Sequence, residues 1–255
     1  MRFPRVIAPF ALAALAVGAS TSAASAASAA TTDDTPAHAT STHARAASRA
    51  PHVTSSSTLA DDQAAGAALT AARITALTAE IAKITADTSM SDTDRSAALS
   101  TMNTDLAAMK TLQSTIAADT DAAKALADVR SVDRDYRVMS VVIPQVRLAA
   151  RADRLTGRLL PRAEAAQKRL QSRLDAASAG SGDAASAMSD LSTQLATVQK
   201  DTDGVATAAL AVTPSAFNAN HAVLVAVRST LTSARTAATA AAHDLGVVRS
   251  ALHKK

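Results

Sequence analysis

Cysteine and tryptophan are absent from this chain of 255 residues, and tyrosine occurs once. Without cysteine, neither a disulfide nor a thiolate metal ligand is possible, so stability must come from burial along the secondary structure. Aromatic side chains make up only 2% of the residues. Platforms that stack sugars or single-stranded nucleic acid use several exposed rings, so we expect neither ligand, and no nucleic-acid partner.

The apolar residues are mostly small. Hydrophobic residues make up 48% of the chain, and many of them are alanine. Alanine has the highest helix propensity, but its burial removes only about one methyl group from water. A core of this kind requires contact along extended helices. The composition therefore predicts an all-α fold of long antiparallel helical hairpins in a coiled-coil-like bundle.

Residues 1–29 have the pattern of a signal peptide. Arg2 and Arg5 precede an apolar run from Val6 to Val17, and small residues follow this run. A retained anchor is the alternative, although the run is shorter than the roughly 20 residues that span a bilayer. We expect cleavage between Ala27 and Thr31, and hence an exported protein, either secreted or associated with the cell envelope.

Residues 30–58 are rich in Ser, Thr and Ala, contain Pro36 and Pro51, and show no apolar periodicity. Such a composition predicts a disordered linker. A plain spacer is the simpler interpretation, and O-glycosylation of its hydroxyl side chains is the alternative.

Apolar residues at alternating spacings of three and four begin soon after Leu59, which places them on one side of a helix. Two such runs flank the polar segment Ala86–Asp94. Two helices joined by a short turn lie antiparallel, so we expect an acidic helical hairpin over residues 59–128. The first run comprises Ala67, Thr70, Ile74, Leu77, Ile81 and Ile84, and the second comprises Leu99, Met102, Leu106, Met109, Gln113 and Ile116.

A connector over residues 129–144 follows, and we expect it to be kinked or irregular near 136–144. Pro144 disfavours the helical conformation at the preceding residue. The β-branched residues of Val138–Ile143 leave a short strand as the alternative. Gly157 and Pro161 are a second point at which a helix would bend or divide.

Residues 145–255 are predicted to form a three-helix region that changes from basic to neutral. The segment Ser178–Asp183 has a turn composition, and the three-and-four spacing then continues from Met188 to Val212. Thr213 and Pro214 are an N-cap followed by a proline at the first helical position, which predicts that the final helix starts there.

Two motifs resemble those of a group of alanine-rich exported actinobacterial proteins. The first is Asp135-Tyr136-Arg137-Val138, which leads to Pro144 and then to Ala152-Asp153, and the second is Thr213–Ala222. Met139 replaces a second tyrosine of that group, and Ala216-Phe217 replaces Asp-Trp. The resemblance covers roughly residues 69–248 and implies an exported helical architecture without supplying an activity.

The sequence contains no catalytic, cofactor-binding or metal-binding pattern, so we expect no enzyme. The paired aspartates near 92, 119 and 201 resemble calcium ligands, but Val212 stands where an EF-hand needs its glutamate. We interpret these aspartates as helix caps and turns. One compact polar cluster, Asn218, Asn220 and His221, is expected to satisfy the first turn of the final helix, with a binding site as the alternative.

Charge is distributed unevenly. Residues 59–128 contain five basic and ten acidic side chains, whereas residues 129–174 contain eleven basic and four acidic ones. Five arginines spaced by three and four form a basic stripe if the helix continues, and they are the candidate anion-binding residues. These are Arg147, Arg151, Arg154, Arg158 and Arg162.

Two functional hypotheses follow from this charge distribution. If the acidic hairpin neutralises the stripe, the protein is a non-catalytic structural or interaction protein of the envelope or extracellular space. Its helical surfaces would then contact a protein partner or a second copy. If the stripe faces outward, residues 147–173 form a binding module for anionic envelope polymers or lipid surfaces.

Overall fold

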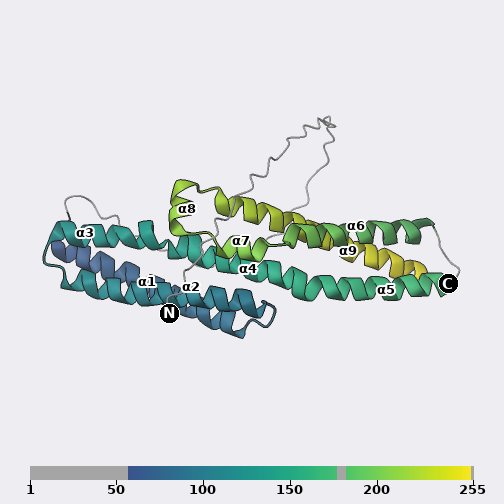
Figure 1. The fold of residues 1–255 in the computed structure, drawn as a ribbon, viewed down its shortest axis with the longest axis horizontal. Coiled ribbons are helices and arrows are strands. Elements are labelled where there is room, and N and C mark those ends of the chain that lie inside the picture. The colour runs from purple at the N-terminus through teal and green to yellow at the C-terminus, as the bar shows by residue number, and fades with distance from the viewer. Residues whose placement is uncertain (1–56, 177–181, 254–255) are drawn as a thin grey trace, which may run out of the picture. The chain divides into compact units, whose positions relative to one another are not determined.

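The computed structural model describes residues 57–176 and 182–253, which are almost entirely helical, and no strand occurs within these two ranges. The predicted all-α fold class is therefore confirmed (Figure 1). All described residues belong to one compact unit, Ser48–Lys255. Along the chain the elements are α1 Leu59–Ala86, α2 Asp92–Ala118, α3 Ala122–Ser131, η1 Val132–Tyr136, η2 Val138–Val142, α4 Ile143–Arg154, η3 Leu155–Leu159, α5 Leu160–Ala176, α6 Gly182–Thr202, α7 Val205–Leu210, α8 Pro214–Ala219 and α9 Val223–His253, where η marks a π-helix.

Short polar side chains start the first three helices. Thr58 and Asp61 form a reciprocal capping box, in which each side chain accepts from the other's backbone N–H at 3.2 and 3.1 Å. Ser91 caps α2, and Asp121 caps α3 by accepting from the N–H of Lys124 at 2.9 Å. The predicted signal peptide and all but the last two residues of the predicted linker lie outside the described residues.

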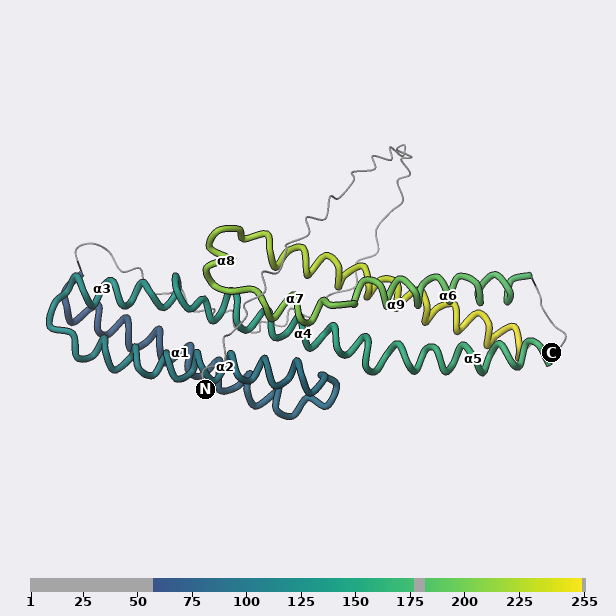
Figure 2. Tube along the Cα trace, viewed as in Figure 1, coloured from purple at the N-terminus to yellow at the C-terminus, as the bar shows by residue number. Residues whose placement is uncertain are grey.

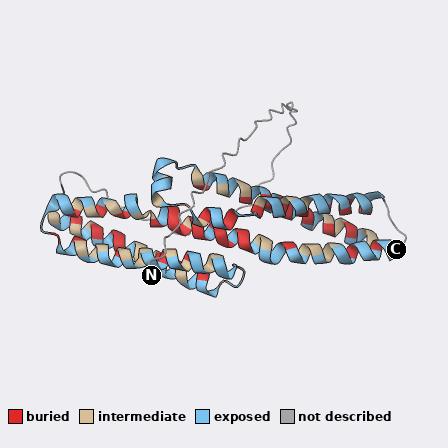
Figure 3. Ribbon diagram, in the orientation of Figure 1, coloured by how far each residue is buried: buried red, intermediate tan, exposed pale blue. Residues whose placement is uncertain are grey.

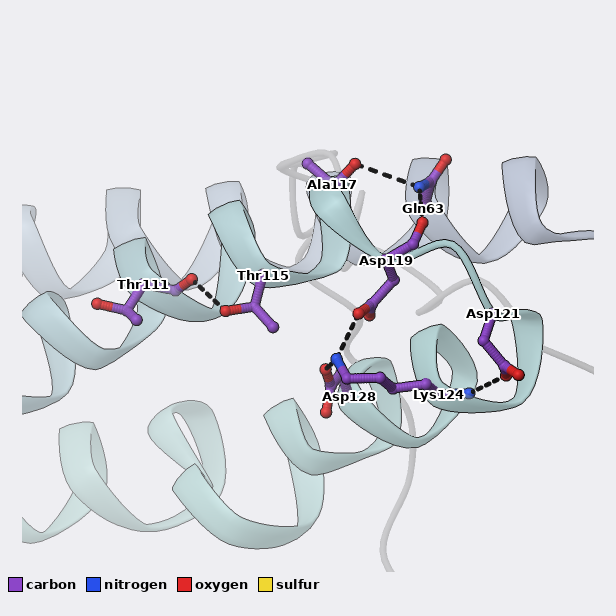
Figure 4. Close-up of polar contacts among 8 residues, drawn as sticks. All are labelled: Gln63, Thr111, Thr115, Ala117, Asp119, Asp121, Lys124 and Asp128. Atoms are coloured by element: carbon purple, nitrogen blue, oxygen red, sulfur yellow. Dashed lines mark hydrogen bonds and ion pairs between the residues drawn. The ribbon is translucent and has the colours of Figure 1, made fainter.

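A polar junction joins the beginning of α1 to the end of α2 (Figure 4). The side-chain amide of Gln63 donates to the carbonyl oxygens of Ala117 and Asp119, at 3.2 and 2.9 Å. Lys124 on α3 binds the carboxylates of both Asp119 and Asp128. The predicted boundary after residue 128 therefore falls inside a third helix, because the cap at Asp121 starts a helix that continues to Ser131.

The apolar side chains of α1 to α4, α7 and the first part of α9 share one hydrophobic core. Leu77, Met102, Met109 and Ile116 are buried in it, as the three-and-four spacing predicts. Ala67 is exposed instead, because the buried side of α1 at this level presents Gly66 and Leu69. Burial is densest along α4, where eight of twelve residues are buried (Figure 3).

The predicted irregular centre contains two π-helical turns, η1 before Arg137 and η2 after it. This residue has a φ of 50° and is the one described non-glycine residue with a positive φ. Its left-handed conformation costs roughly 1–2 kcal/mol. The alternative of a strand at Val138–Ile143 is wrong, because this segment is helical and buries Val138, Val141 and Val142.

Pro144 is the second residue of α4 and follows η2 without a break. Ile143 before it is helical despite the proline, and its N–H donates to the carbonyl of Val138 in the wider π-helical turn. From Ile143 to Ala176 the chain then continues as one helical rod through α4, η3 and α5 (Figure 2). The expected weak point around Gly157 takes the form of the π-helical turn η3, in which the N–H of Leu160 donates to the carbonyl of Leu155. The helix therefore widens at this position without ending.

The second core lies between α5, α6 and the later part of α9. Leu191, Leu195 and Val198 of α6 and Leu245 and Val248 of α9 are buried in it. Most of the predicted turn at Ser178–Asp183 lies outside the described residues, and α6 begins at Gly182.

Two predicted helices are each divided in the structure. The run from Met188 to Val212 breaks at Gly204, whose φ of 65° starts the separate helix α7. Thr213 does cap a helix, but α8 ends at Ala219, and the long helix α9 begins only at Val223. The first break separates the two cores, because Val198 before it packs in the second core, whereas Val205 and Ala209 after it pack in the first.

Within the two described ranges, no helix combines the length and the apolar character needed to cross a membrane.

Gly66 tests how closely α1 approaches its neighbours. A Cβ atom at this position would lie 2.7 Å from Cγ2 of Ile116 and 3.0 Å from Cγ2 of Val129. We expect Gly66→Ala to lower the free energy of unfolding by about 1–3 kcal/mol, because these branched side chains have little room to move. Gly246→Ala is the control, since nothing lies within 4 Å of its Cβ position. It should raise stability by about 0.5–1 kcal/mol through helix propensity. Urea unfolding of both variants measures this, and a stabilised Gly66→Ala protein would contradict the packing.

Candidate anion-binding groove

The sequence of α4 determines which of its side chains reach the surface. Eight of its twelve residues are buried, and Arg147, Arg151 and Arg154 lie on the face that remains exposed. Their spacing of four and three matches the helical repeat, so all three project from one side of the rod. This is the beginning of the predicted basic stripe.

Arg147, the first arginine of the stripe, is paired within the molecule. Its guanidinium donates two hydrogen bonds of 2.8 Å to the carboxylate of Glu80 on α1. The Glu80 side chain is 4% exposed, whereas that of Arg147 is 52% exposed. The hydrogen bonds from Arg147 lower the pKa of Glu80 despite its burial. Arg147 therefore stabilises the contact between α1 and α4 and has little charge left for a ligand.

Arg154 is held by the turn between α1 and α2. Its guanidinium lies 3.3 Å from the carboxylate of Asp87 and 3.5 Å from the hydroxyl of Ser89. The neighbouring Asp153 accepts from the N–H of Ser91 at 2.9 Å, and burial is the main cause of its raised pKa. The same turn thus contacts both residues and fixes the end of α4.

A groove separates the rod from α9 and consists of two adjoining hollows. The first has a volume of about 760 Å³ and the second about 440 Å³, and both are lined by Arg154, Leu159, Ala238 and Ala242. We call them together the arginine groove, because seven arginines and no acidic residue line them. The rod contributes Arg151, Arg154, Arg158 and Arg162, and α9 contributes Arg228, Arg235 and Arg249.

The floor of the arginine groove is apolar. The rod supplies Leu148, Leu155 and Leu159, while α9 supplies Leu231 and Leu245 together with several alanines. Leu159 is 36% exposed, which makes it one of three large exposed apolar side chains in the described chain. The groove therefore combines basic rims with an uncovered apolar floor.

Six of these seven arginines have no ion pair within the described part of the chain, the exception being Arg154. The alternative of internal neutralisation thus applies to Arg147 and Arg154, whereas Arg151, Arg158 and Arg162 remain unpaired. The groove brings together four of the five predicted stripe residues. Arg147 does not line the groove, because its side chain extends toward Glu80 on α1.

The opposite rim of the groove is not predicted from the sequence. Arg228, Arg235 and Arg249 are spaced by seven and fourteen residues, so they lie in one row along α9. Leu231 and Ala238 follow Arg228 and Arg235 by three residues, and Leu245 precedes Arg249 by four, so a buried row runs beside the arginines. This repeat was available as a signal, but nothing local indicates that the row faces a second set of arginines.

The predicted polar cluster lies elsewhere, on α8 and in the turn after it. Asn218 accepts from Nε of Arg137 at 2.7 Å and donates to the carbonyl of Arg134 at 2.8 Å. Arg137 also lies over the ring of Phe217, 5.5 Å from its centroid. These contacts hold the left-handed residue in place. Asn218 thus does not satisfy the first turn of the final helix.

The other two members have separate contacts. Asn220 accepts from the N–H of Ala222 at 2.9 Å, just before α9. The ring of His221 packs against Phe217, with 4.7 Å between centroids. The three side chains therefore do not converge on a common ligand position. Among the described residues, no group of three or more His, Asp or Glu side chains is placed to hold a metal ion.

The Glu80–Arg147 pair predicts a pH-dependent loss of stability in Arg147→Gln. Removing the arginine leaves a buried carboxylate with only Lys83 nearby, at 3.4 Å, which should cost about 1–3 kcal/mol at neutral pH. Because the pKa of Glu80 is lowered by folding, the contribution is present above its usual value and is lost as the pH falls through the folded value.

The matched control is Arg151→Gln, an exposed arginine one turn along α4 without an ion pair. Urea unfolding from neutral pH downward should show a difference between Arg147→Gln and the wild type that narrows in acid, and no such difference for the control. A constant difference across this range would exclude the Glu80 pair as its cause.

No protein-family model, no curated protein and no solved structure matches this chain. The resemblance of its two motifs to alanine-rich exported proteins therefore stays a prediction.

Proposed function

We propose that this chain is an exported, non-catalytic helical interaction protein that binds an anionic ligand in the arginine groove. The observation that supports this proposal is the lining of the groove, where seven arginines face one another without an acidic side chain. Of the two hypotheses from the sequence, this favours the anionic-ligand module. Its binding residues extend from the rod onto α9.

Electrostatics supports the choice of ligand charge. Arginines on two facing rims add their potentials, and an apolar floor between them focuses this field because it has a low dielectric constant. Salt weakens the field, with a Debye length of about 30 Å at 0.01 M and about 8 Å at 0.15 M. An anion in the groove would be attracted by both rims at once. Arginine also forms paired hydrogen bonds to carboxylate and phosphate groups, which lysine does not.

The helices would serve as a rigid scaffold for these rims. We propose that α1 with α2, and α6 with α9, form antiparallel coiled-coil-like pairs. Gln63 near the start of α1 contacts the end of α2, and Arg95 near the start of α2 donates to the carbonyl of Asp87 just after α1. Asp201 near the end of α6 accepts from Ser233 in the first half of α9. These contacts support opposite chain directions in both pairs.

Binding of inorganic polyphosphate tests the proposed function. The groove variant replaces Arg151, Arg158, Arg228 and Arg235 with glutamine. The control variant replaces Lys110, Arg130, Arg173 and Lys200, which are exposed, lie outside the groove and have no ion pair among the described residues. Both variants lose four positive charges, so they differ only in where the charges were.

At low salt we expect the wild type and the control to bind polyphosphate, and the groove variant to bind it about tenfold more weakly or worse. Binding should also weaken as salt is raised. Titration calorimetry across salt concentrations measures this. Equal losses in both variants would show that net charge alone attracts the anion, and would reject the groove as the site.

A further inference from the structure

We infer that the ligand of the arginine groove is a single-chain amphiphile, with its anionic head between the arginine rims and its acyl chain along the floor. This inference rests on the proposed function and names its ligand class. A polyanion would use only the rims. The apolar floor between the rims can add to affinity only if the ligand also carries an apolar part.

The floor owes its depth to alanine. Ala238 and Ala242 on α9 line both hollows, with Ala163 and Ala166 opposite them on α5. Alanine extends no further than Cβ, so the space between the two helices is not filled by side chains. Of the leucines beside this space, Leu155 is half-buried and Leu159 is exposed, whereas Leu148, Leu231 and Leu245 are buried beneath them. A flexible acyl chain supplies the missing apolar contact.

The π-helical turn η3 lies in the wall of the groove. Three of its five residues, Leu155, Arg158 and Leu159, line the hollows. Such turns occur often at functional sites, because the wider turn redirects side chains that a regular α-helix would place elsewhere. Here one turn supplies two floor residues and one rim residue of the same groove.

The size of the groove favours an amphiphile over a helix of another protein. Its hollows of about 760 and 440 Å³ are in the range of small-molecule pockets, roughly 300–1,000 Å³. A protein helix is about 10–12 Å across with its side chains, and a stable protein interface needs roughly 800 Å² from each partner. The competing occupant is a helix of another protein with an acidic and an apolar side, and the experiment tests it with an acidic amphipathic peptide.

The test uses monomeric alkyl phosphates with octyl, decyl and dodecyl chains, measured by calorimetry below their micelle concentrations. Affinity of the wild-type protein should rise about threefold to fourfold for each added methylene group, the factor expected when a CH₂ leaves water. Alkyl trimethylammonium of the same chain lengths should bind far more weakly, because the rims are basic.

Ala242→Phe is the variant that separates chain from head. Ala242 is exposed and lines both hollows, so a phenyl ring should fill the floor while all seven arginines remain. We expect this variant to keep polyphosphate binding and to lose the dependence on chain length. Ala226→Phe, also exposed on α9 but outside the lining, should behave like the wild type.

The outcomes separate the two proposals. Polyphosphate binding through the groove arginines without any dependence on chain length would overturn the amphiphile and leave the proposed function standing. Binding of neither anion through these arginines would overturn both. If a model acidic amphipathic peptide displaces polyphosphate, and Ala242→Phe weakens the peptide but no alkyl phosphate binds, the occupant is a protein helix and the inference is wrong.

Discussion

Close packing of alanine-rich helix surfaces is the constraint on which the rest of this structure depends. A buried alanine contributes about one methyl group, so stability accumulates only where two helices stay in contact over many turns. The long helix α9 shares the second core with α6, and Ala237, Ala238 and Ala241 are buried in this core. On the side of α9 that faces the rod, Ala238 and Ala242 are too small to fill the space between the helices, and the arginine groove remains. The scaffold and the groove thus arise from one compositional property.

Ion pairing divides the arginines of the basic stripe into a paired and an unpaired group. The acidic α1 uses Glu80 to pair with Arg147, and the turn after α1 uses Asp87 to hold Arg154. Beyond that turn, no acidic side chain lines the groove, so the remaining arginines keep their charge. Arg147 and Arg154 therefore hold the rod to the acidic helices, whereas Arg151, Arg158 and Arg162 have no ion pair among the described residues.

The strained backbone conformation of Arg137 is compensated by side-chain contacts from α8. Arg137 adopts a left-handed conformation between two π-helical turns, and both Asn218 and the ring of Phe217 contact its side chain. These partners come from α8, about eighty residues later in the chain. The motifs that resemble those of exported actinobacterial proteins thus meet in space at one structural feature, separate from the groove. The contact between the two motifs joins the π-helical turns beside Arg137 to the short helix α8, and apolar spacing alone predicts neither.

The sequence by itself determined the helical class, because alanine content and three-and-four spacing are local properties of the chain. It also determined the cap at Thr213, since a hydroxyl side chain needs only the next turn to act. Tertiary structure decided the breaks at Gly204 and Asn220, the pairing of Arg147 with Glu80, and the arginines of α9 as the second rim. Each of these depends on which distant surfaces pack together. Helical spacing determines which residues share a face of a helix. Which helix lies opposite that face is determined only by the packing of α9 beside the rod.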